Sequence, residues 1–510
     1  MFRPIQLFIL SLLFLGCARE VDYKTLTIAY SADIRGFDPA YATDLRTGKV
    51  ISLVYDNLVR FDANMNLAPA IAHSWSVNNT GRIYTFNIRN NVRFHDGTSL
   101  TINDITKSFH RILDPQTSSP QTWLLERITG AKDFMSGKAD HVRGLQIAND
   151  SSLVVELDEA FAPFIQYLAM PATAIINSNG IESLSTVPAG SGPWRLETWA
   201  RDGELLFSRN KDYWDTPPIT DNLRIRILSE VMTQSAEFET GSLDILEVPQ
   251  GEIEYWRQYN YDQLEVEELN IWYIGMNCSR PPFDDLRLRQ AMNYSIDREK
   301  IIHILLNGSA ALASGPVPPQ LLSEVTELRY EYNPSRAIQL LKEAGFGNSL
   351  QTEIYVAGGS GMFHVLEALQ SDWAAVGITV EIKRSDWNVF KTAVREGKPD
   401  LYYLDWFADY PDGENFLYPL FYSTESMKNR NRFSDPDIDA IIIKIQGLPN
   451  NAERQRLIAD ANKLIVDAAP WVFLWHSKTI YLTQQWIKDF QPSPIFNANR
   501  YMNISKMAPE

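Results

Sequence analysis

The segment from Trp406 to Phe416, with the sequence WFADYPDGENF, places three acidic residues among four aromatic rings. The acids are Asp409, Asp412 and Glu414, and the Pro-Asp-Gly sequence between them predicts a turn. Carboxylates in such surroundings have four possible roles: an acid/base pair, a metal site, a clamp for a cationic ligand, or a polar turn over a hydrophobic core. Which of these roles they have decides what the protein does.

A catalytic role is poorly supported by the spacing of these acids. Paired catalytic carboxylates, as in glycosidases, face each other across a substrate and usually come from separate elements. Asp409, Asp412 and Glu414 lie instead on one short turn. The sequence also has no GxSxG motif and no Cys/His arrangement that would supply a nucleophile. We therefore expect a protein that is not an enzyme, with a hydrolase as the unlikely alternative.

Metal and nucleotide sites lack sequence support as well. The seven His are scattered, and no CxxC, HExxH or HxxxH spacing is present. No GxxxxGK[ST] or GxGxxG motif opens a helix, so a nucleotide site has no motif either. We expect no cofactor.

The composition is that of a folded, acidic protein. Of 510 residues, 45% are hydrophobic and 22% are charged, and the formal net charge is −16. This length predicts two or three domains. A nucleic-acid-binding surface requires a basic face, and the sequence contains no basic cluster, so nucleic acid is not expected as a partner.

The amino-terminal residues are typical of an export signal. Arg3 precedes an apolar run from Ile5 to Leu15, which is shorter than the ~20 residues needed to span a bilayer. The sequence FLGC that ends the run resembles a lipobox, the site at which bacteria attach lipid to a Cys and cleave before it. We therefore expect lipid on Cys17, with an ordinary secretion signal as the alternative.

Lipidation would determine the location of the mature chain. The signal peptide would cover 1–16 and a lipidated tether 17–25. The protein would then be periplasmic or at the cell surface, anchored to a bacterial membrane by the lipid on Cys17. Cys278 would be the single remaining cysteine, so no intramolecular disulfide is expected.

The elements around the acidic segment alternate between strands and helices. Strands are predicted at TEIYVA, ITVEIK and DLYYLDW, with helices between them at FHVLEALQSDWAAVG and DWNVFKTAVREG. This order is typical of a sheet with crossover helices. Ligands of open α/β sheets bind at the carboxyl ends of the strands, and the acidic segment follows the last of these strands. A capped helix at NAERQRLIADANKLIVDAA and two short strands, WVFLW and TIYLT, should complete this region.

The amino-terminal half shows a different pattern of predicted elements. The stretch RIYTFNIRNNVRFHDG alternates apolar and polar residues, which predicts a β-hairpin closed by a turn at Asp96 and Gly97. Thr101, with Asp104 three residues later, should cap a following helix. Asp285, Asp297 and Pro334 are expected near the starts of three further helices.

Five ordered motifs resemble those of extracellular solute-binding proteins of family 5, the oligopeptide- and dipeptide-binding subunits of ABC importers. They are a block from LAPAIAHSW to FHRILDP, then AGSGPWRLETW, RNKDYWD, LRQAMNYSIDREKII and YNPSRAIQLLKEAGF. DWFADYPDGENFLYPLF is similar to the ligand-contact segment of that family. The likeness extends from about Leu26 to Tyr481.

The resemblance implies an α/β fold of the periplasmic-binding-protein type (type II, class C), a two-lobed clam shell with an extra inserted domain. Lobe I would combine 26–55, 171–266 and 479–510, with 56–170 inserted as the extra domain, and lobe II would cover 267–478. The chain would cross between the lobes at ELNIWYIGMN and at WHSKTIYLT, which would act as hinge strands.

The resemblance also implies the function and the partners. A monomeric binding protein would capture an oligopeptide between closing lobes and deliver it to the permease and ATPase subunits of an ABC importer. Relatives bind nickel chelates, haem, opines, murein peptides or oligosaccharides, so a non-peptide cargo is the alternative within the family. A receptor that presents its ligand to a sensor is a third possibility.

The family carries the peptide's α-ammonium group onto Asp409. Trp406, Phe407 and Tyr410 would form a low-dielectric wall in which an ion pair with an ammonium is strengthened. Asp412 and Glu414 are expected to be solvated turn residues.

The chain lacks the Arg with which relatives hold the peptide carboxylate. Relatives use an Arg in neighbourhoods that read VAGGSGMF and YYLD in this chain, and neither contains an Arg or Lys. His364 and Arg384 are the nearby substitutes. A longer peptide, whose carboxylate is solvated or held by mobile groups, therefore fits better than a dipeptide.

Overall fold

The computed structural model describes residues 21–181, 184, 186–324, 327–347, 349–358, 362–425 and 430–507. The predicted signal peptide and Cys17 lie outside these residues. Within them, no helix is both long and apolar enough to cross a membrane.

The first sheet brings together two distant parts of the chain. Its strand order is β1-β10-β9-β8, with β1 parallel to β10 and the other pairs antiparallel. The strands are β1 (Thr25–Tyr30), β8 (Trp194–Ala200), β9 (Glu204–Arg209) and β10 (Asn222–Ile227), and α1 (Leu45–Val54) follows β1 in the chain. The amino-terminal strand β1 thus pairs with a strand almost two hundred positions later in the chain.

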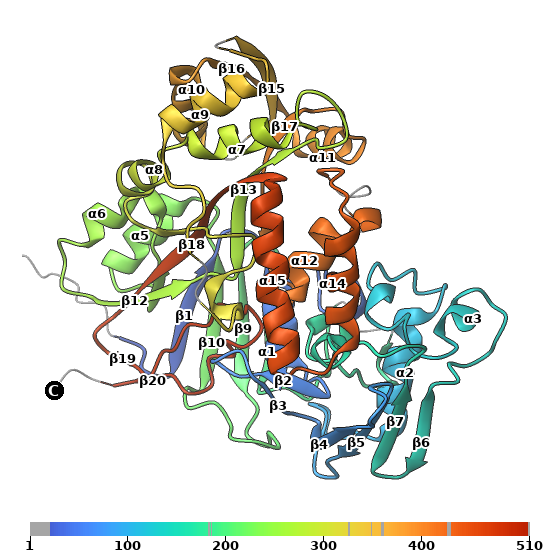
Figure 1. Cartoon of the computed structure of the whole chain (residues 1–510). Coiled ribbons are helices and arrows are strands. Elements are labelled where there is room, and N and C mark those ends of the chain that lie inside the picture. Colours follow the sequence, from blue (N-terminus) through green and yellow to red (C-terminus); the bar gives the residue numbers. More distant parts are fainter. Residues whose placement is uncertain are drawn as a thin grey trace, which may run out of the picture.

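Between these two parts of the chain lies a separate four-stranded sheet, which protrudes at the lower right of Figure 1. Its order is β4-β5-β7-β6, and a short ladder of β2 and β3 precedes it. The elements are β2 (Val59–Phe61), β3 (Leu67–Pro69), β4 (Ala72–Val77), β5 (Ile83–Ile88), α2 (Ile102–Leu113), α3 (Ala131–Met135), β6 (Leu145–Asn149), β7 (Ser152–Glu156) and α4 (Phe164–Tyr167). The capping box predicted for Thr101 and Asp104 is confirmed at the start of α2.

The predicted hairpin over residues 82–97 is wrong. Strand β5 pairs with β4 and β7, and not with the residues that follow it. The turn at Asp96 and Gly97 exists, but it closes only an isolated bridge between Arg93 and Ser99. The alternating pattern did identify β5 as a half-buried strand, but a pattern of period two does not reveal which strand will be its neighbour.

The third sheet is the largest, with eight strands. Its main order is β11-β18-β13-β17-β15-β16, and β12 and β14 also pair with β18. The strands are β11 (Ile245–Glu247), β12 (Asp262–Glu267), β13 (Asn270–Met276), β14 (Ala310–Leu312), β15 (Leu350–Ala357), β16 (Ile378–Ser385), β17 (Leu401–Phe407) and β18 (Trp471–Thr483). Figure 1 shows β15, β16 and β17 at the top, β1 and β10 below, and β18 running between the two regions.

The predicted strand–helix–strand–helix–strand order is confirmed as β15, α10, β16, α11 and β17, with β15 parallel to both of the other strands. The helices of this region are α7 (Leu286–Tyr294), α8 (Arg298–Ile304), α9 (Pro334–Glu343), α10 (Phe363–Ala375), α11 (Trp387–Arg395), α12 (Glu414–Phe421), α14 (Pro436–Gly447) and α15 (Ala452–Ala468), and α5 (Val231–Glu239) and α6 (Ile253–Trp256) precede it. Asp285 and Asp297 cap α7 and α8, and Pro334 starts α9, as predicted.

The two short strands predicted near the carboxyl terminus are one long strand. Strand β18 runs without interruption over thirteen residues. Its first part pairs with β13, its middle with β14, and its end with β12 and β11. The polar residues from His476 to Lys478 therefore do not break the strand, because β14 and β12 satisfy their backbone groups.

The carboxyl-terminal segment returns to the first sheet. After β18 it forms β19 (Ile487–Lys488) and β20 (Ser505–Lys506), which pair with each other. Lys506 reaches the buried carboxylate of Asp244 at 2.9 Å. The end of the chain is thus fastened beside β1.

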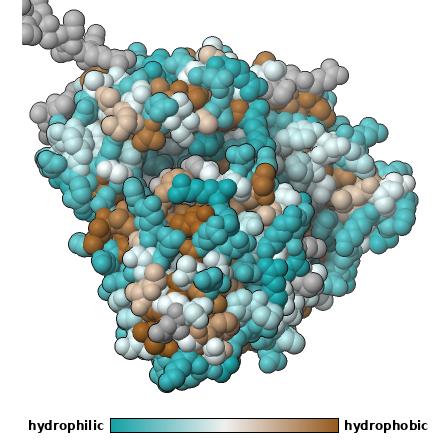
Figure 2. Space-filling model, turned by 90° about the horizontal axis from the view of Figure 1, so that it is seen from above, coloured by the Kyte–Doolittle hydropathy of each residue, from teal (hydrophilic) through white to brown (hydrophobic). Residues whose placement is uncertain are grey.

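Figure 2 shows that hydrophilic residues cover most of the face seen from above, with hydrophobic residues in separate groups. Scattered exposed apolar side chains are normal for a folded protein. On this face, therefore, apolar surface does not by itself mark a binding site.

Candidate ligand-binding site

A cavity of about 940 Å³ lies at the junction of the first and third sheets. One wall comes from β1, α1 and the carboxyl-terminal segment, and the other from β13, β17 and β18. Ligand sites in proteins commonly enclose about 300–1,000 Å³. The cavity is therefore large enough for a short peptide or a compound of similar size, and it lies where the predicted hinge strands meet.

The acidic segment reaches this cavity at the end of β17. Phe407 and Ala408 line it, and Phe407 is 37% exposed. Strand β17 pairs with β15 only through Leu401 and Tyr402, so in the described ladders its last residues lack a strand partner on that edge. An unpaired edge offers backbone donors and acceptors to an extended ligand.

Asp409 lies just beyond the cavity lining. Its backbone N–H donates to Asn415 Oδ1 at 3.0 Å. Burial raises the pKa of its carboxyl to about 6, and a hydrogen bond with the Asn415 side chain opposes the shift. Within the described residues, no ion pair links Asp409 to a cationic side chain. A desolvated carboxylate without a cation suits the predicted contact with an ammonium group, but Asp409 is not among the residues that line the cavity.

Trp406 and Tyr410 are held by the protein itself. The guanidinium of Arg430 lies 5.3 Å from the ring centroid of Trp406, and Trp406 Nε1 donates to Asn415 Oδ1 at 3.3 Å. Tyr410 is buried, its hydroxyl donates to Glu414 Oε2, and its ring packs edge-on against Tyr167 with centroids 5.1 Å apart. Of the three predicted aromatic residues, only Phe407 lines the cavity.

The expectation that Asp412 and Glu414 are solvated is wrong. Both are buried. Asp412 forms a two-pronged ion pair with the buried Arg454, at 2.9 and 3.0 Å, and Glu414 accepts a hydrogen bond from Gln446. Two helices, α14 and α15, cover the turn and supply these partners. Acids on a Pro-Gly turn look exposed in a sequence because nothing nearby in the chain identifies the distant cation that neutralises them.

The turn is also joined to the segment around α4. Gln166 Nε2 donates to Asp412 Oδ2 at 2.7 Å, and Ala162 N donates to the Gln446 carbonyl at 2.7 Å. Residues predicted to belong to the inserted domain thus contact residues predicted to belong to lobe II.

His364 and Arg384 are not brought to the cavity. The His364 side chain is 87% exposed, with Glu367 3.4 Å away on the same helix. The Arg384 guanidinium stacks on the ring of Phe363, 3.8 Å from its centroid. In the structure neither residue lines the cavity, and their predicted contact with a ligand carboxylate stays untested.

Several polar lining residues were not identified from the sequence. They include Tyr30 of β1, Lys49 of α1, Glu247 of β11, Glu268 between β12 and β13, Tyr481 of β18, and Tyr501. A signal for two of them was available, because Glu268 and Tyr481 lie in the two segments identified as hinge strands. The others come from elements that only the sheet topology brings together.

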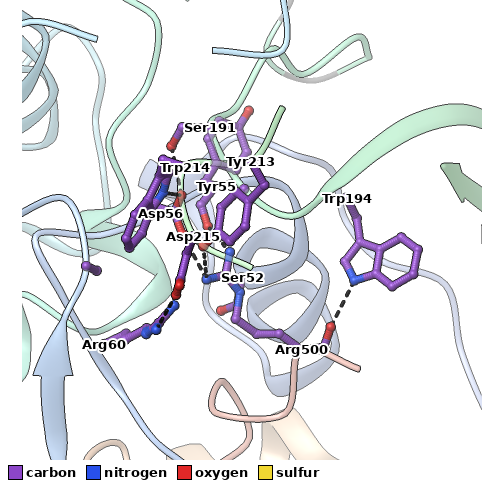
Figure 3. Close-up of polar contacts among 12 residues, drawn as sticks. Ser52, Tyr55, Asp56, Arg60, Ser191, Trp194, Tyr213, Trp214, Asp215 and Arg500 are labelled. Atoms are coloured by element: carbon purple, nitrogen blue, oxygen red, sulfur yellow. Dashed lines mark hydrogen bonds and ion pairs between the residues drawn. The ribbon is translucent and has the colours of Figure 1, made fainter. Parts of the chain in front are cut away.

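The carboxyl-terminal wall of the cavity is anchored by a buried ion pair (Figure 3). Arg500 lies next to Tyr501 in this wall, and its Nη1 is 2.8 Å from Oδ1 of Asp56, which is fully buried. The Asp56 carboxylate also accepts hydrogen bonds from Tyr213 and Trp214 at 3.0 and 2.8 Å. The Arg500 guanidinium also donates to the Tyr213 hydroxyl and the Tyr55 carbonyl, and so it fastens the last part of the chain to residues 287 and 445 positions earlier.

Comparison with known proteins places the chain in a family. Residues 66–428 match the model of the bacterial extracellular solute-binding proteins, family 5 Middle. The chain is 28% identical over 523 residues to di/tripeptide-binding protein 2 of Pseudomonas aeruginosa, covering 97% of this chain and 98% of that protein. It is 27% identical over 500 residues to heme-binding protein A of Haemophilus influenzae, covering 92% and 90%.

A solved structure agrees. The structure of HbpA2 from Haemophilus parasuis superposes with a TM-score of 0.84 at 25% identity, covering 95% of this chain and 100% of that one. The members of this family are solute-binding proteins and not enzymes. With the family model matching more than half of its length, the chain belongs to the bacterial extracellular solute-binding proteins of family 5.

Proposed function

We propose that this protein is the oligopeptide-capturing subunit of an ABC importer. The observation that carries the proposal is the cavity of about 940 Å³, which has one wall from the two ends of the chain and the other from β13, β17 and β18. The unpaired edge at the end of β17 can bond the backbone of an extended peptide, and side chains can enter a hydrated space without strong sequence selection. A relative named as a di/tripeptide-binding protein supports this cargo.

Asp409 is proposed to hold the peptide's amino terminus. Its carboxylate is desolvated and follows directly after two residues of the cavity wall. A small closing movement of the strands that link the two regions would be sufficient to bring an ammonium group and this carboxylate together.

We further propose that lobe II (267–478) closes on lobe I (26–55, 171–266 and 479–510), which carries the extra domain 56–170. Lipid on Cys17 would hold the monomeric protein at the membrane beside the permease and ATPase.

The cargo is tested most directly by native mass spectrometry of the purified full chain, followed by calorimetric titration with tri- to pentapeptides. We expect co-purified peptides of mixed sequence and tight binding of peptides with a free amino terminus. Equal binding of N-acetylated peptides would remove the role of Asp409, and failure to bind any peptide would contradict the proposed function.

Haem is the second candidate cargo, because one relative is named as a heme-binding protein. No His or Cys is found among the described residues that line the cavity, although Tyr residues are present. A Soret absorption band in the purified protein, or one that appears on titration with haemin at one equivalent, would favour haem.

The proposed role of Asp409 predicts that peptide binding depends on pH. Burial raises the pKa of this carboxyl to about 6, so the group is ionised above pH 6 and neutral below it. An ammonium ligand binds only to the ionised form with full strength. The affinity should therefore be highest near pH 7, because the peptide's α-ammonium group begins to lose its proton toward pH 8, and it should fall as pH drops through 6, by up to about tenfold per pH unit.

Calorimetry with an all-alanine tetrapeptide from pH 5 to pH 8 measures this dependence. The matched control is Asp409→Asn, in which the weaker affinity should no longer change with pH. A wild-type affinity that does not change between pH 5 and pH 7 would contradict the prediction.

A further inference from the structure

Two carboxylates and three tyrosine rings line the cavity close to the hinge strands. We call this group the acid–tyrosine cluster, and it consists of Glu247, Glu268, Tyr30, Tyr481 and Tyr501. Glu247 lies directly opposite Tyr481 in the pairing of β11 with β18. Burial raises the pKa of Tyr481 and of Tyr30; the charges of Glu247 and Glu268 add to the shift of Tyr481, and the neighbouring Tyr501 and Tyr481 add to that of Tyr30. All five side chains line the same cavity, and the strand pairing places Glu247 beside Tyr481.

Glu268 occupies the link between β12 and β13, at one of the two crossings predicted for the chain. Its backbone N–H donates to the Ser477 carbonyl of β18 at 2.9 Å, which fixes its position. Burial raises the pKa of its carboxyl to about 7, a hydrogen bond with Thr479 opposes the shift, and the charge of Glu247 adds to it. Glu268 is therefore a carboxylate that the fold holds in a poorly solvated place beside a second carboxylate.

The other charged residues of the cavity do not neutralise this pair. They are Asp44, Arg46, Lys49 and Lys478. Asp44 pairs with Arg35 and Lys478 pairs with Glu265, whereas Arg46 donates to the neutral hydroxyl of Ser31. The charge of Lys49 lowers the pKa of Glu268, but it is the smallest of the four contributions, and within the described residues no ion pair joins Lys49 to either glutamate. The two carboxylates thus share the cavity with two cations, Arg46 and Lys49, and within the described residues neither cation forms an ion pair with them.

Tyr30 gives an independent indication that a partner belongs here. Its ring lines the cavity and the residue is 9% exposed. Its buried hydroxyl has no partner at normal hydrogen-bond distance among the described residues, and a weaker contact with the Tyr501 side chain adds to the effect of burial in raising the pKa of Tyr30. A buried hydroxyl that is only weakly bonded costs free energy, and a ligand group that donates a hydrogen bond to it would reduce that cost.

We propose that the acid–tyrosine cluster is a subsite for a cationic side chain, that of lysine or arginine, of the bound peptide. This inference rests on the proposed function, because it names the kind of peptide that the cavity prefers. The glutamates would supply charge-assisted hydrogen bonds, the Tyr30 hydroxyl would accept another, and the faces of Tyr481 and Tyr501 suit a cation. A metal ion is a poorer match, because the described residues contain no group of three side chains that could hold one.

The test compares peptides that differ only in one charge. Tetrapeptides of alanine carry either lysine or the uncharged norleucine at position two, three or four, so all share the same amino terminus. The full chain, Glu268→Gln, Glu247→Gln and the control Glu265→Gln are titrated by calorimetry at pH 8. Glu265 is a suitable control because it lies on β12, outside the cavity lining, and because its partner Lys478 keeps a second carboxylate, that of Glu267 at 3.5 Å, when Glu265 is replaced. Thermal unfolding of each variant checks that it is folded.

At the one of these three peptide positions whose side chain reaches the subsite, we expect the wild-type protein to bind the lysine peptide at least about tenfold more tightly than the norleucine peptide. This preference should fall to about twofold or less in Glu268→Gln and Glu247→Gln, with little change in norleucine-peptide affinity, and should persist in Glu265→Gln. Binding of all peptides without a lysine preference would overturn the subsite and leave the proposed function intact. Binding of none would overturn both. An ε-acetyl-lysine peptide that binds wild type as tightly as the lysine peptide would also refute the subsite, without any variant.

Discussion

Replacing Asp409 by alanine is expected to weaken the binding of a peptide with a free amino terminus by about one to three orders of magnitude. The reason is that the peptide's amino-terminal ammonium group, once enclosed by the cavity, would lose the carboxylate proposed to neutralise it. In the low-dielectric surroundings indicated by the raised pKa of Asp409, such a charge-assisted contact is worth about 1.5–3 kcal/mol, and an ammonium left buried without it costs more.

Calorimetric titration with free and N-acetylated forms of one tetrapeptide measures this effect. In the wild-type protein the free form should bind far more tightly, and in Asp409→Ala or Asp409→Asn the two forms should bind almost equally. Asp405→Asn is the matched control. Asp405 lies on β17, and burial raises its pKa as it does that of Asp409. It differs from Asp409 because the charge of Arg430 opposes the shift and partly neutralises the carboxylate. If Asp409→Asn retains the wild-type preference for the free amino terminus, the assignment fails.

The weaker peptide binding expected of Asp409→Asn should not arise from a loss of folding stability. The pKa of Asp409 is raised in the folded protein, so its ionised form is less favourable there than in the unfolded chain. Above pH 6 the wild-type protein carries this unfavourable charge, and the neutral Asn removes it. The Asp409→Asn variant should therefore unfold at the same temperature as wild type or higher when both are free of ligand.

The sequence predicted the local elements around the site well, because their signals lie within a few residues. Helix α10 buries Leu366, Leu369 and Trp373, the face that the spacing indicates, and α11 ends before Gly397, whose backbone φ of +70° suits glycine. Helix caps were equally clear, since an Asp or Asn before an apolar repeat satisfies backbone donors locally.

Partners that are distant in the chain could not be predicted in this way. The burial of Asp412 depends on Arg454 from α15, and the continuity of β18 depends on four partner strands. The acid–tyrosine cluster likewise brings Glu247 and Glu268 together with Tyr30 of the first strand. Each of these arrangements results from topology, which the spacing of residues in one segment does not encode.

Replacing Arg500 by methionine is expected to destabilise the protein by about 3 kcal/mol or more, because the fully buried Asp56 would lose its cationic partner. The carboxylate would keep its hydrogen bonds from Tyr213 and Trp214, but these neutral donors do not balance a buried charge. The adjoining wall at Tyr501 should loosen as well, so peptide affinity should fall together with stability. Urea denaturation followed by tryptophan fluorescence measures the first effect, because Trp214 donates to this same carboxylate.

Arg60→Met is the matched control, since Arg60 pairs with Asp215 at 2.7 Å in the same region (Figure 3) but both side chains are about one-third exposed. An ion pair screened by solvent contributes at most about 1 kcal/mol, so this variant should stay close to wild type. Adding Asp56→Asn to Arg500→Met should restore part of the loss, because the amide needs no cation. If the two single Arg variants lose the same small amount, or if the double variant is no more stable than Arg500→Met, the buried charge is not what fastens the end of the chain to the cavity wall.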